Sequence, residues 1–204
     1  MNRFLEKSKR TLSGLWNDYS GMFVCFIIIA VCSLLAPGFL RWNNFITILR
    51  NCSAIGIIAL GMTIVIISGG IDLSVGSNFA ICGVILIVLQ KAGLPLATCI
   101  LISCVFGLSM GLLNGFLIAC FRLPPFIVTL ATQTLLRSIV QYITNGSSMS
   151  GQRTPFLHVV GNGSIAGGLP VPFLIFLALA AVMHLLLSRT KFGVYAYAIG
   201  GNET

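Results

Sequence analysis

The stretch from Gly69 to Ser77 reads GGIDLSVGS and holds residue types that could do chemistry. It interrupts apolar sequence with flexible glycines, hydroxyl groups and Asp72, the only acidic residue between Asp18 and Glu203. An ionisable side chain at membrane depth costs about 3 kcal/mol on insertion scales, so it marks a candidate site. A break in a helix at that depth also exposes backbone groups to a water-filled path. The candidate pathway residues are Gly69, Gly70, Asp72, Ser74, Gly76 and Ser77.

A local interpretation of Asp72 is compatible with this one. Asp72 precedes the apolar run 75–89, and its carboxylate can accept hydrogen bonds from the free amides at the start of the following helix. An uncapped helix end in lipid would leave these donors unsatisfied. We therefore expect Asp72 to cap a helix next to a broken hairpin rather than to act as a catalytic acid.

A second set of polar residues recurs at every fourth position: Thr129, Gln133, Arg137 and Gln141. This spacing gives one polar stripe on an apolar helix, which must face protein or water rather than lipid. Gln133 and Arg137 are therefore candidate pathway residues. The alternative for Arg137 is a snorkelling or helix-packing arginine, hydrogen-bonded to carbonyls or to the two glutamines.

The sequence GLSMG, residues 107–111, matches a GxSxG motif around Ser109, and His184 lies further along the chain. An intramembrane serine protease is the hypothesis that this pair suggests. The alternative is close helix packing, because small residues four apart share one helix face. The packing candidates are Gly107, Gly111 and Gly115, together with Asn114 as an interhelical hydrogen-bonding residue. Packing already explains the motif, so no catalytic residue is assigned.

Composition places these residues in a membrane protein. The chain has 57% hydrophobic residues, 8% charged residues and a mean hydropathy of +1.02, values typical of polytopic membrane proteins. Its formal net charge of +8 comes from basic residues scattered at the ends of apolar runs, which indicates topology anchors and not a nucleic-acid surface. The seven cysteines form no CxxC pair, and the acids and histidines are dispersed, so we expect no disulfide, metal or cofactor.

Six apolar runs are long enough, or nearly so, to cross a membrane at roughly 20 residues each. The predicted fold is all-α, a polytopic helical membrane protein with about six transmembrane helices in one domain, 1–204. A segment at 41–50 should lie at the membrane surface and lead into the second run. The runs cover residues 21–40, 52–68, 75–89, 96–121, 125–143 and 170–187.

The distribution of basic residues predicts orientation. Seven fall on the side of the N-terminus, and four fall on the other side. The positive-inside rule places the N-terminal segment 1–20 in the cytoplasm, the loop 144–169 outside, and the segment 189–204 inside. The inner set is Arg3, Lys7, Lys9, Arg10, Arg122, Arg189 and Lys191, and the outer set is Arg41, Arg50, Lys91 and Arg153.

Four stretches carry a family resemblance across nearly the whole chain: GMTIVIISGGIDLSVGS, NGFLIACFRLPPFIVTL, LLRSIVQYITNGS and TKFGVYAYAIGGNET. In these the chain resembles the permease subunits of bacterial ABC importers for ribose and related monosaccharides. The resemblance implies a multi-pass protein of the bacterial inner membrane that forms a path for a pentose or hexose, whose hydroxyl groups could meet the exposed backbone of the break.

The same resemblance implies partners. A separate cytoplasmic ATPase, a periplasmic sugar-binding protein and a second permease subunit would complete the importer. The chain contains no GxxxxGK[ST] phosphate loop, so the nucleotide would be held by another chain and no enzyme activity is expected here. Segment 189–204 would begin the contact with the ATPase through Gly193, Gly200, Gly201, Asn202 and Glu203.

Permeases of this family continue well past the GGNE motif, whereas this sequence stops at Thr204. It is therefore interpreted as an N-terminal part of a permease, incomplete relative to the larger family bundle. Three interpretations stay open: a working split subunit, a truncated remnant that does not transport, and an interaction partner that occupies a permease's place in an assembly.

Overall fold

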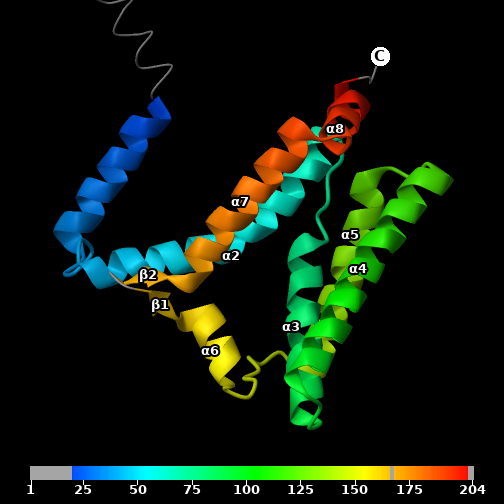
Figure 1. The fold of residues 1–204 in the computed structure, drawn as a ribbon. Helices are drawn as coiled ribbons and strands as arrows, with labels where there is room; N and C mark the ends of the chain where they lie inside the picture. The colour runs from blue at the N-terminus through cyan, green and yellow to red at the C-terminus, as the bar shows by residue number, and fades with distance from the viewer. Residues whose placement is uncertain (1–19, 166–167, 202–204) are drawn as a thin grey trace, which may run out of the picture. The chain divides into compact units, whose positions relative to one another are not determined.

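The computed structural model describes residues 20–165 and 168–201 (Figure 1). An apolar helix, Ser20–Leu35, precedes the labelled elements. These elements are α2 (Trp42–Ile67), α3 (Val75–Lys91), α4 (Leu96–Phe121), α5 (Pro125–Thr144), α6 (Pro155–Asn162), β1 (Ser164–Ile165), β2 (Leu169–Pro170), α7 (Val171–Arg189) and α8 (Lys191–Gly201).

The fold is all-α, as predicted. Four described helices are long and apolar enough to cross a membrane: α2, α4, α5 and α7. Ser20–Leu35 and α3 are shorter apolar helices. At 1.5 Å per residue, the 17 residues of α3 extend about 25 Å, less than a hydrocarbon core of about 30 Å. Helix α3 alone is therefore shorter than such a core.

Three segments have more secondary structure than the sequence analysis specified. Residues 42–50 of the expected surface segment are helical and continue without a stop signal into the second apolar run, which gives one 26-residue helix, α2. The loop 144–169 contains α6 and, with Leu169–Pro170, an antiparallel strand pair. The tail after Arg189 is helical in α8. Residues 1–19, which hold four of the inner basic residues, lie outside the described residues, as do Asn202 and Glu203.

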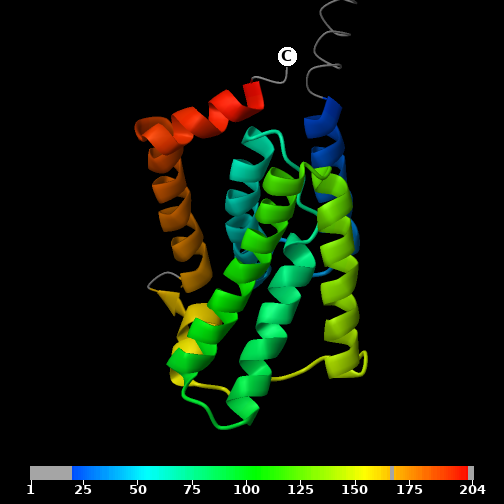
Figure 2. The same ribbon diagram turned by 90° about the vertical axis from the view of Figure 1, so that its right-hand side faces the viewer.

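The described residues fall into two compact units, divided between Leu49 and Arg50. In the second unit, α3 packs on both α4 and α5, and the three helices lie side by side (Figure 2). Ile81 and Val84 of α3, with Val128 and Leu136 of α5, are buried there. Long apolar side chains on the other faces, such as Leu101, Leu108 and Leu112 of α4, are exposed. This arrangement suits a lipid environment, because the apolar side chains on the outward faces need no polar partner.

Helix α7 packs against α6 and α8. It also meets α2 at Gly56, where an added Cβ would lie 2.6 Å from the ring of Phe176. A glycine is therefore required at this crossing unless Phe176 moves.

Candidate solute pathway at the helix break

The GGIDLSVGS stretch lies at a break between α2 and α3, with residues 68–74 outside both helices. The end of α2 is closed by two hydrogen bonds, from the Gly69 amide to the Ile66 carbonyl at 3.0 Å and from the Gly70 amide to the Val65 carbonyl at 2.9 Å. This is the pattern of a Schellman motif, which needs a left-handed residue at its first position after the cap. Gly69 supplies it with a φ of +79°, so the first glycine of the motif is fixed by backbone geometry.

Asp72 is held by the residue two positions later. Its Oδ1 accepts hydrogen bonds from the Ser74 amide at 2.8 Å and from the Ser74 hydroxyl at 2.7 Å. The carboxylate thus accepts the amide of Ser74, which is itself the N-cap residue of α3, so Asp72 lies two residues before the cap position that the sequence predicted for it. The helix itself begins at Val75, and the Ser74 side chain makes no capping hydrogen bond to it.

Two neighbouring helices reach the break through side chains. Asn114 of α4 donates from Nδ2 to Ser74 Oγ at 3.0 Å. Thr132 of α5 donates to Asn114 Oδ1 at 2.7 Å. A continuous chain of hydrogen bonds therefore runs from α5 through α4 to Ser74 and Asp72. Ser74 is 2% exposed and Asn114 is 5% exposed, so this network is shielded, and losing one member would leave its partners unsatisfied.

Thr129 adds a second tie between α5 and the break. Its hydroxyl lies 2.8 Å from the Pro125 carbonyl and 3.3 Å from the carbonyl of Ile71, which is part of the break. Thr129 is 1% exposed. Sequence reasoning identified Thr129 only as a member of the polar stripe and missed Thr132. Thr132 lies three residues after Thr129 and therefore on the same side of the helix, and this spacing could have identified Thr132 from the sequence.

A cavity of about 460 Å³ lies beside the break. We call it the break cavity. The walls combine the glycines and carboxylate of the motif with the polar and small residues of α4 and α5, and α8 contributes one side chain. The lining residues are Val65, Ser68, Gly69, Gly70, Ile71, Asp72, Gly111, Asn114, Gly115, Ile118, Pro125, Thr129 and Ile199.

The three glycines of α4 have different surroundings among the described residues. An added Cβ at Gly107 would lie 2.9 Å from the sulfur of Cys82 on α3, so Gly107 does allow close helix contact. Asn78 of α3 donates to the Gly107 carbonyl at 3.1 Å. An added Cβ at Gly111 or Gly115 would meet no described atom within 4 Å. These two line the break cavity.

The other residues of the motif lie beyond the break cavity. Ser77 is buried and donates to the Ser74 carbonyl at 2.8 Å. Gly76 is exposed, and an added Cβ there would meet no described atom within 4 Å. Neither residue lines the break cavity, so the motif divides into a wall segment and a helix-start segment.

Arg137 also lies away from the break cavity. It lines a different cavity of about 410 Å³ with Gln141, Ser77 and the turn 146–148. Gln133 lines neither of these two cavities. The polar stripe of α5 is therefore split along the helix: Thr129 reaches the break, and Arg137 lies near the other end. The pathway roles of Gln133 and Arg137 remain predictions.

The described part of the predicted coupling segment lies next to the same break. An added Cβ at Gly200 of α8 would collide with the Ile67 carbonyl and lie 3.2 Å from the Gly69 amide. Ile199 lines the break cavity. Gly193 is buried at the turn from α7, against the Leu187 carbonyl, and an added Cβ at Gly201 would meet no described atom within 4 Å. Asn202 and Glu203 lie outside the described residues.

The protease arrangement is not present in the described part of the chain. The Ser109 hydroxyl donates to the Phe106 carbonyl of its own helix at 2.7 Å, and no hydrogen bond joins Ser109 to His184 there. Within residues 20–165 and 168–201, no group of three or more His, Cys, Asp or Glu side chains could hold a metal ion.

Comparison with known proteins identifies relatives. The family described as "Branched-chain amino acid transport system / permease component" matches residues 44–204. The ribose import permease of Bacillus subtilis (strain 168) is 35% identical over 199 residues, covering 97% of this chain and 62% of that protein. The ribose import permease of Haemophilus influenzae is 38% identical over 180 residues, which cover 87% of this chain and 55% of that protein.

The D-allose transport system permease of Escherichia coli (strain K12) is 32% identical over 200 residues, or 97% of this chain and 61% of that protein. No solved structure matches. The chain thus spans somewhat more than half the length of these curated relatives. Because the family match extends over most of its length and includes the break, α4, α5 and α8, this chain belongs to the branched-chain amino acid transport system permease family.

Proposed function

We propose that this chain forms part of the membrane path of an ABC importer, and that the break cavity is where a monosaccharide meets it. The observation that carries the proposal is the cavity of about 460 Å³ at an interrupted helix, lined by Asp72, Asn114 and Thr129. Discontinuous helices in transporters place backbone and side-chain polar groups where a solute can reach them. Similarity to ribose and D-allose permeases supports the same solute class.

The wall chemistry suits a neutral solute rich in hydroxyl groups. Asp72 uses Oδ1 for Ser74, while its Oδ2 accepts no hydrogen bond from the described residues. A sugar hydroxyl that donates to this oxygen would form a charge-assisted hydrogen bond. Among the described residues, no Lys, Arg or His lines the break cavity, so the carboxylate of a free amino acid would find no cation in this part of the chain. This favours a sugar over the amino acids that the family's description names.

The organisation of the importer follows from the proposal. The chain would lie in the bacterial inner membrane with segment 1–20 in the cytoplasm and loop 144–169 facing a periplasmic sugar-binding protein. Segment 189–204 would contact a cytoplasmic ATPase, and a second permease subunit would complete the path. Residues 1–204 would act as one transmembrane domain.

The contact between α8 and the break gives this arrangement a mechanical consequence. Gly200 lies against the last turn of α2, and Ile199 reaches the wall of the break cavity. If α8 moves with an ATPase, the cavity wall moves with it, because tightly packed elements transmit displacement. This would couple nucleotide chemistry in another chain to the solute site.

Filling the break cavity tests the proposal. Gly111→Leu adds a side chain that projects into the cavity without meeting a described atom at its Cβ, and Gly83→Leu adds the same side chain at an exposed position of α3 with equal free space. We would measure hydrogen–deuterium exchange of residues 68–74 in lipid nanodiscs, with and without D-ribose, D-allose or L-leucine. Either sugar should slow exchange in the unmodified chain and in Gly83→Leu, but not in Gly111→Leu.

Two results would contradict the proposal. One is protection by L-leucine and by neither sugar, which would indicate an amino acid path. The other is equal protection by sugar in Gly111→Leu, which would place the solute elsewhere.

A further inference from the structure

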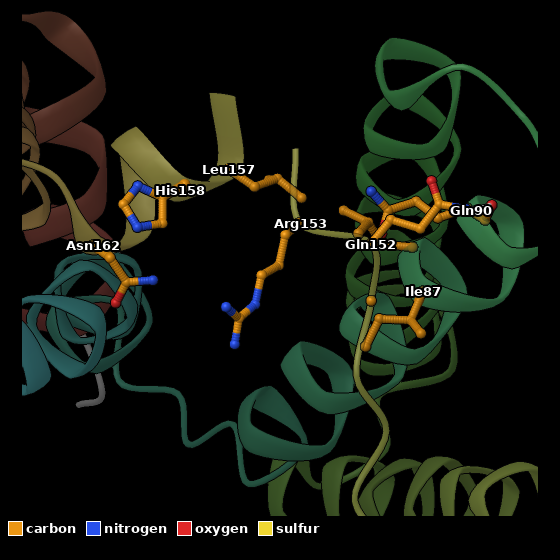
Figure 3. A pocket seen from close by; sticks show the side chains of 9 residues that line it. Ile87, Gln90, Gln152, Arg153, Leu157, His158 and Asn162 are labelled. Atoms are coloured by element: carbon orange, nitrogen blue, oxygen red, sulfur yellow. Dashed lines mark hydrogen bonds between the residues drawn. The ribbon is translucent and has the colours of Figure 1, made fainter. Parts of the chain in front are cut away.

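A second polar cavity, of about 410 Å³, lies at the far end of α3 from the break. We call it the loop cavity. Its walls come from the last turns of α3, from the extended segment 151–153 and from α6 (Figure 3). Gln90 lies fifteen residues after the first residue of α3, so about 22 Å of helix separates this cavity from the break. The lining residues are Leu86, Ile87, Gln90, Gly151, Gln152, Arg153, Leu157, His158 and Asn162.

Gln90 is the unusual residue of this wall. It is only 3% exposed, yet neither its Nε2 nor its Oε1 has a hydrogen-bond partner among the described residues. The Gln152 side chain donates to the backbone carbonyl of Gln90 at 3.3 Å and not to its amide group. A buried amide without a partner is costly, and nearly all buried polar groups in native proteins are hydrogen-bonded to protein or to an ordered bound molecule such as water.

Close packing keeps this amide in place. An added Cβ at Gly151 would lie 2.7 Å from Gln90 Oε1, so the chain passes directly over the amide at a residue without a side chain. The Thr154 hydroxyl accepts a hydrogen bond from the Leu157 amide at 3.4 Å and so caps α6, which begins just after this crossing. The segment that carries Arg153 and the helix that carries His158 are therefore fixed relative to Gln90.

Figure 3 shows the Arg153 side chain extending into the space between His158 and Asn162 on one side and Gln90 and Gln152 on the other. Amide, guanidinium and imidazole groups surround this space, and none of the described residues that line it carries a carboxylate. A fully deprotonated anion could accept from Arg153 and from Gln90 Nε2, but it would leave Oε1 without a donor. A hydroxyl group can donate to Oε1 and accept from Nε2.

We propose that the loop cavity is a second binding site, for a neutral polyhydroxylated solute, in which Gln90 and Arg153 make the hydrogen bonds. The volume lies within the range of roughly 300–1,000 Å³ that small-molecule sites occupy. The choice of a sugar as solute rests on the proposed function. The site itself is distinct from the break cavity and would hold the solute before it enters the path.

The test uses the full chain in nanodiscs with D-ribose and D-allose as probes, and with phosphate as the anionic alternative. Exchange is read at residues 151–158 for the loop cavity and at residues 68–74 for the break cavity. Gln90→Leu removes the amide at nearly constant size, Arg153→Ala removes the guanidinium, and Lys91→Ala is the control, since it removes a neighbouring exposed cation that does not line the cavity.

We expect sugar to slow exchange at 151–158 in the unmodified chain, in Lys91→Ala and in Gly111→Leu, and this protection to be lost in Gln90→Leu and weakened at least about tenfold in apparent affinity in Arg153→Ala. Without sugar, Gln90→Leu should melt at a higher temperature than the unmodified chain, because an unpaired amide has been replaced by an apolar group. This second readout separates loss of binding from loss of structure.

Sugar protection at 151–158 that persists in Gln90→Leu would overturn the inference, as would protection by phosphate alone or no protection at this segment by any probe. If residues 68–74 are protected in such a case, the proposed function stands and only the second site is wrong. If 151–158 alone is protected, the second site stands and the proposed path is wrong.

Discussion

Asn114 on α4 donates a hydrogen bond to the hydroxyl of Ser74, forty residues earlier in the chain, at 3.0 Å. Ser74 in turn donates to Asp72, and Asn114 accepts from Thr132 of α5. One amide side chain thus connects a helix break to the two helices beside it. In an apolar surrounding this bond has few competitors, so it defines where α3 starts relative to α4.

Replacing Asn114 tests this connection. Asn114→Leu leaves the Ser74 and Thr132 hydroxyls without this partner and should lower the free energy of unfolding by about 1–3 kcal/mol. A double-mutant cycle of Asn114→Leu with Thr132→Val, followed by unfolding in detergent, should give a coupling energy near 0.6 kcal/mol, roughly the average for interhelical hydrogen bonds in membranes. Strict additivity of the two changes would show that the bond to Thr132 contributes nothing.

Asp72 should tolerate an amide better than an apolar side chain. Asp72→Asn keeps an oxygen that can accept from the Ser74 amide and hydroxyl, whereas Asp72→Leu removes both bonds at a helix start. We expect Asp72→Asn to retain most membrane assembly, and Asp72→Leu to lose about 1 kcal/mol or more of stability together with sugar protection. Size-exclusion chromatography measures assembly, thermal unfolding measures stability, and the exchange assay measures sugar protection. Normal assembly and sugar protection in Asp72→Leu would refute both the capping and the pathway interpretations.

Leucine substitutions at two glycines of α4 should have different effects on stability. Gly107→Leu forces a side chain against Cys82, where only 2.9 Å is available to its Cβ, and should destabilise the pairing of α3 and α4 by about 1–3 kcal/mol. Gly111→Leu meets open space and should leave the melting temperature nearly unchanged. Thermal unfolding of the two variants in the same detergent measures the contrast. Equal loss in both would mean that an unseen surface packs on Gly111.

Two neighbouring glycines of α8 provide a variant and its control for testing the contact of α8 with the break. Gly200→Val places a side chain against the Ile67 carbonyl and should detach α8, whereas Gly201→Val meets no described atom and serves as control. Limited proteolysis should then cut within 191–201 faster in Gly200→Val than in the unmodified chain, with Gly201→Val close to the latter. Equal cleavage of all three would remove the basis for coupling through α8.

The sequence by itself determined the all-α membrane class and the place of the break. Apolar runs long enough for lipid can satisfy their backbone only as helices, so the predicted run 96–121 coincides with α4, and the run 125–143 ends one residue before α5 does. Glycines and a lone carboxylate between two such runs marked residues 69–77, since left-handed geometry and a helix start need these residue types.

The tertiary structure decided which of these residues act together. Gly107, Gly111 and Gly115 have the same spacing, yet among the described residues only an added Cβ at Gly107 would meet α3, because the periodicity of one helix does not say where its neighbour lies. Thr132 joins the network while Gln133, one residue on, does not line the break cavity. The contact of Gly200 with α2 joins residues more than 130 positions apart, and local sequence patterns carry no information about such contacts.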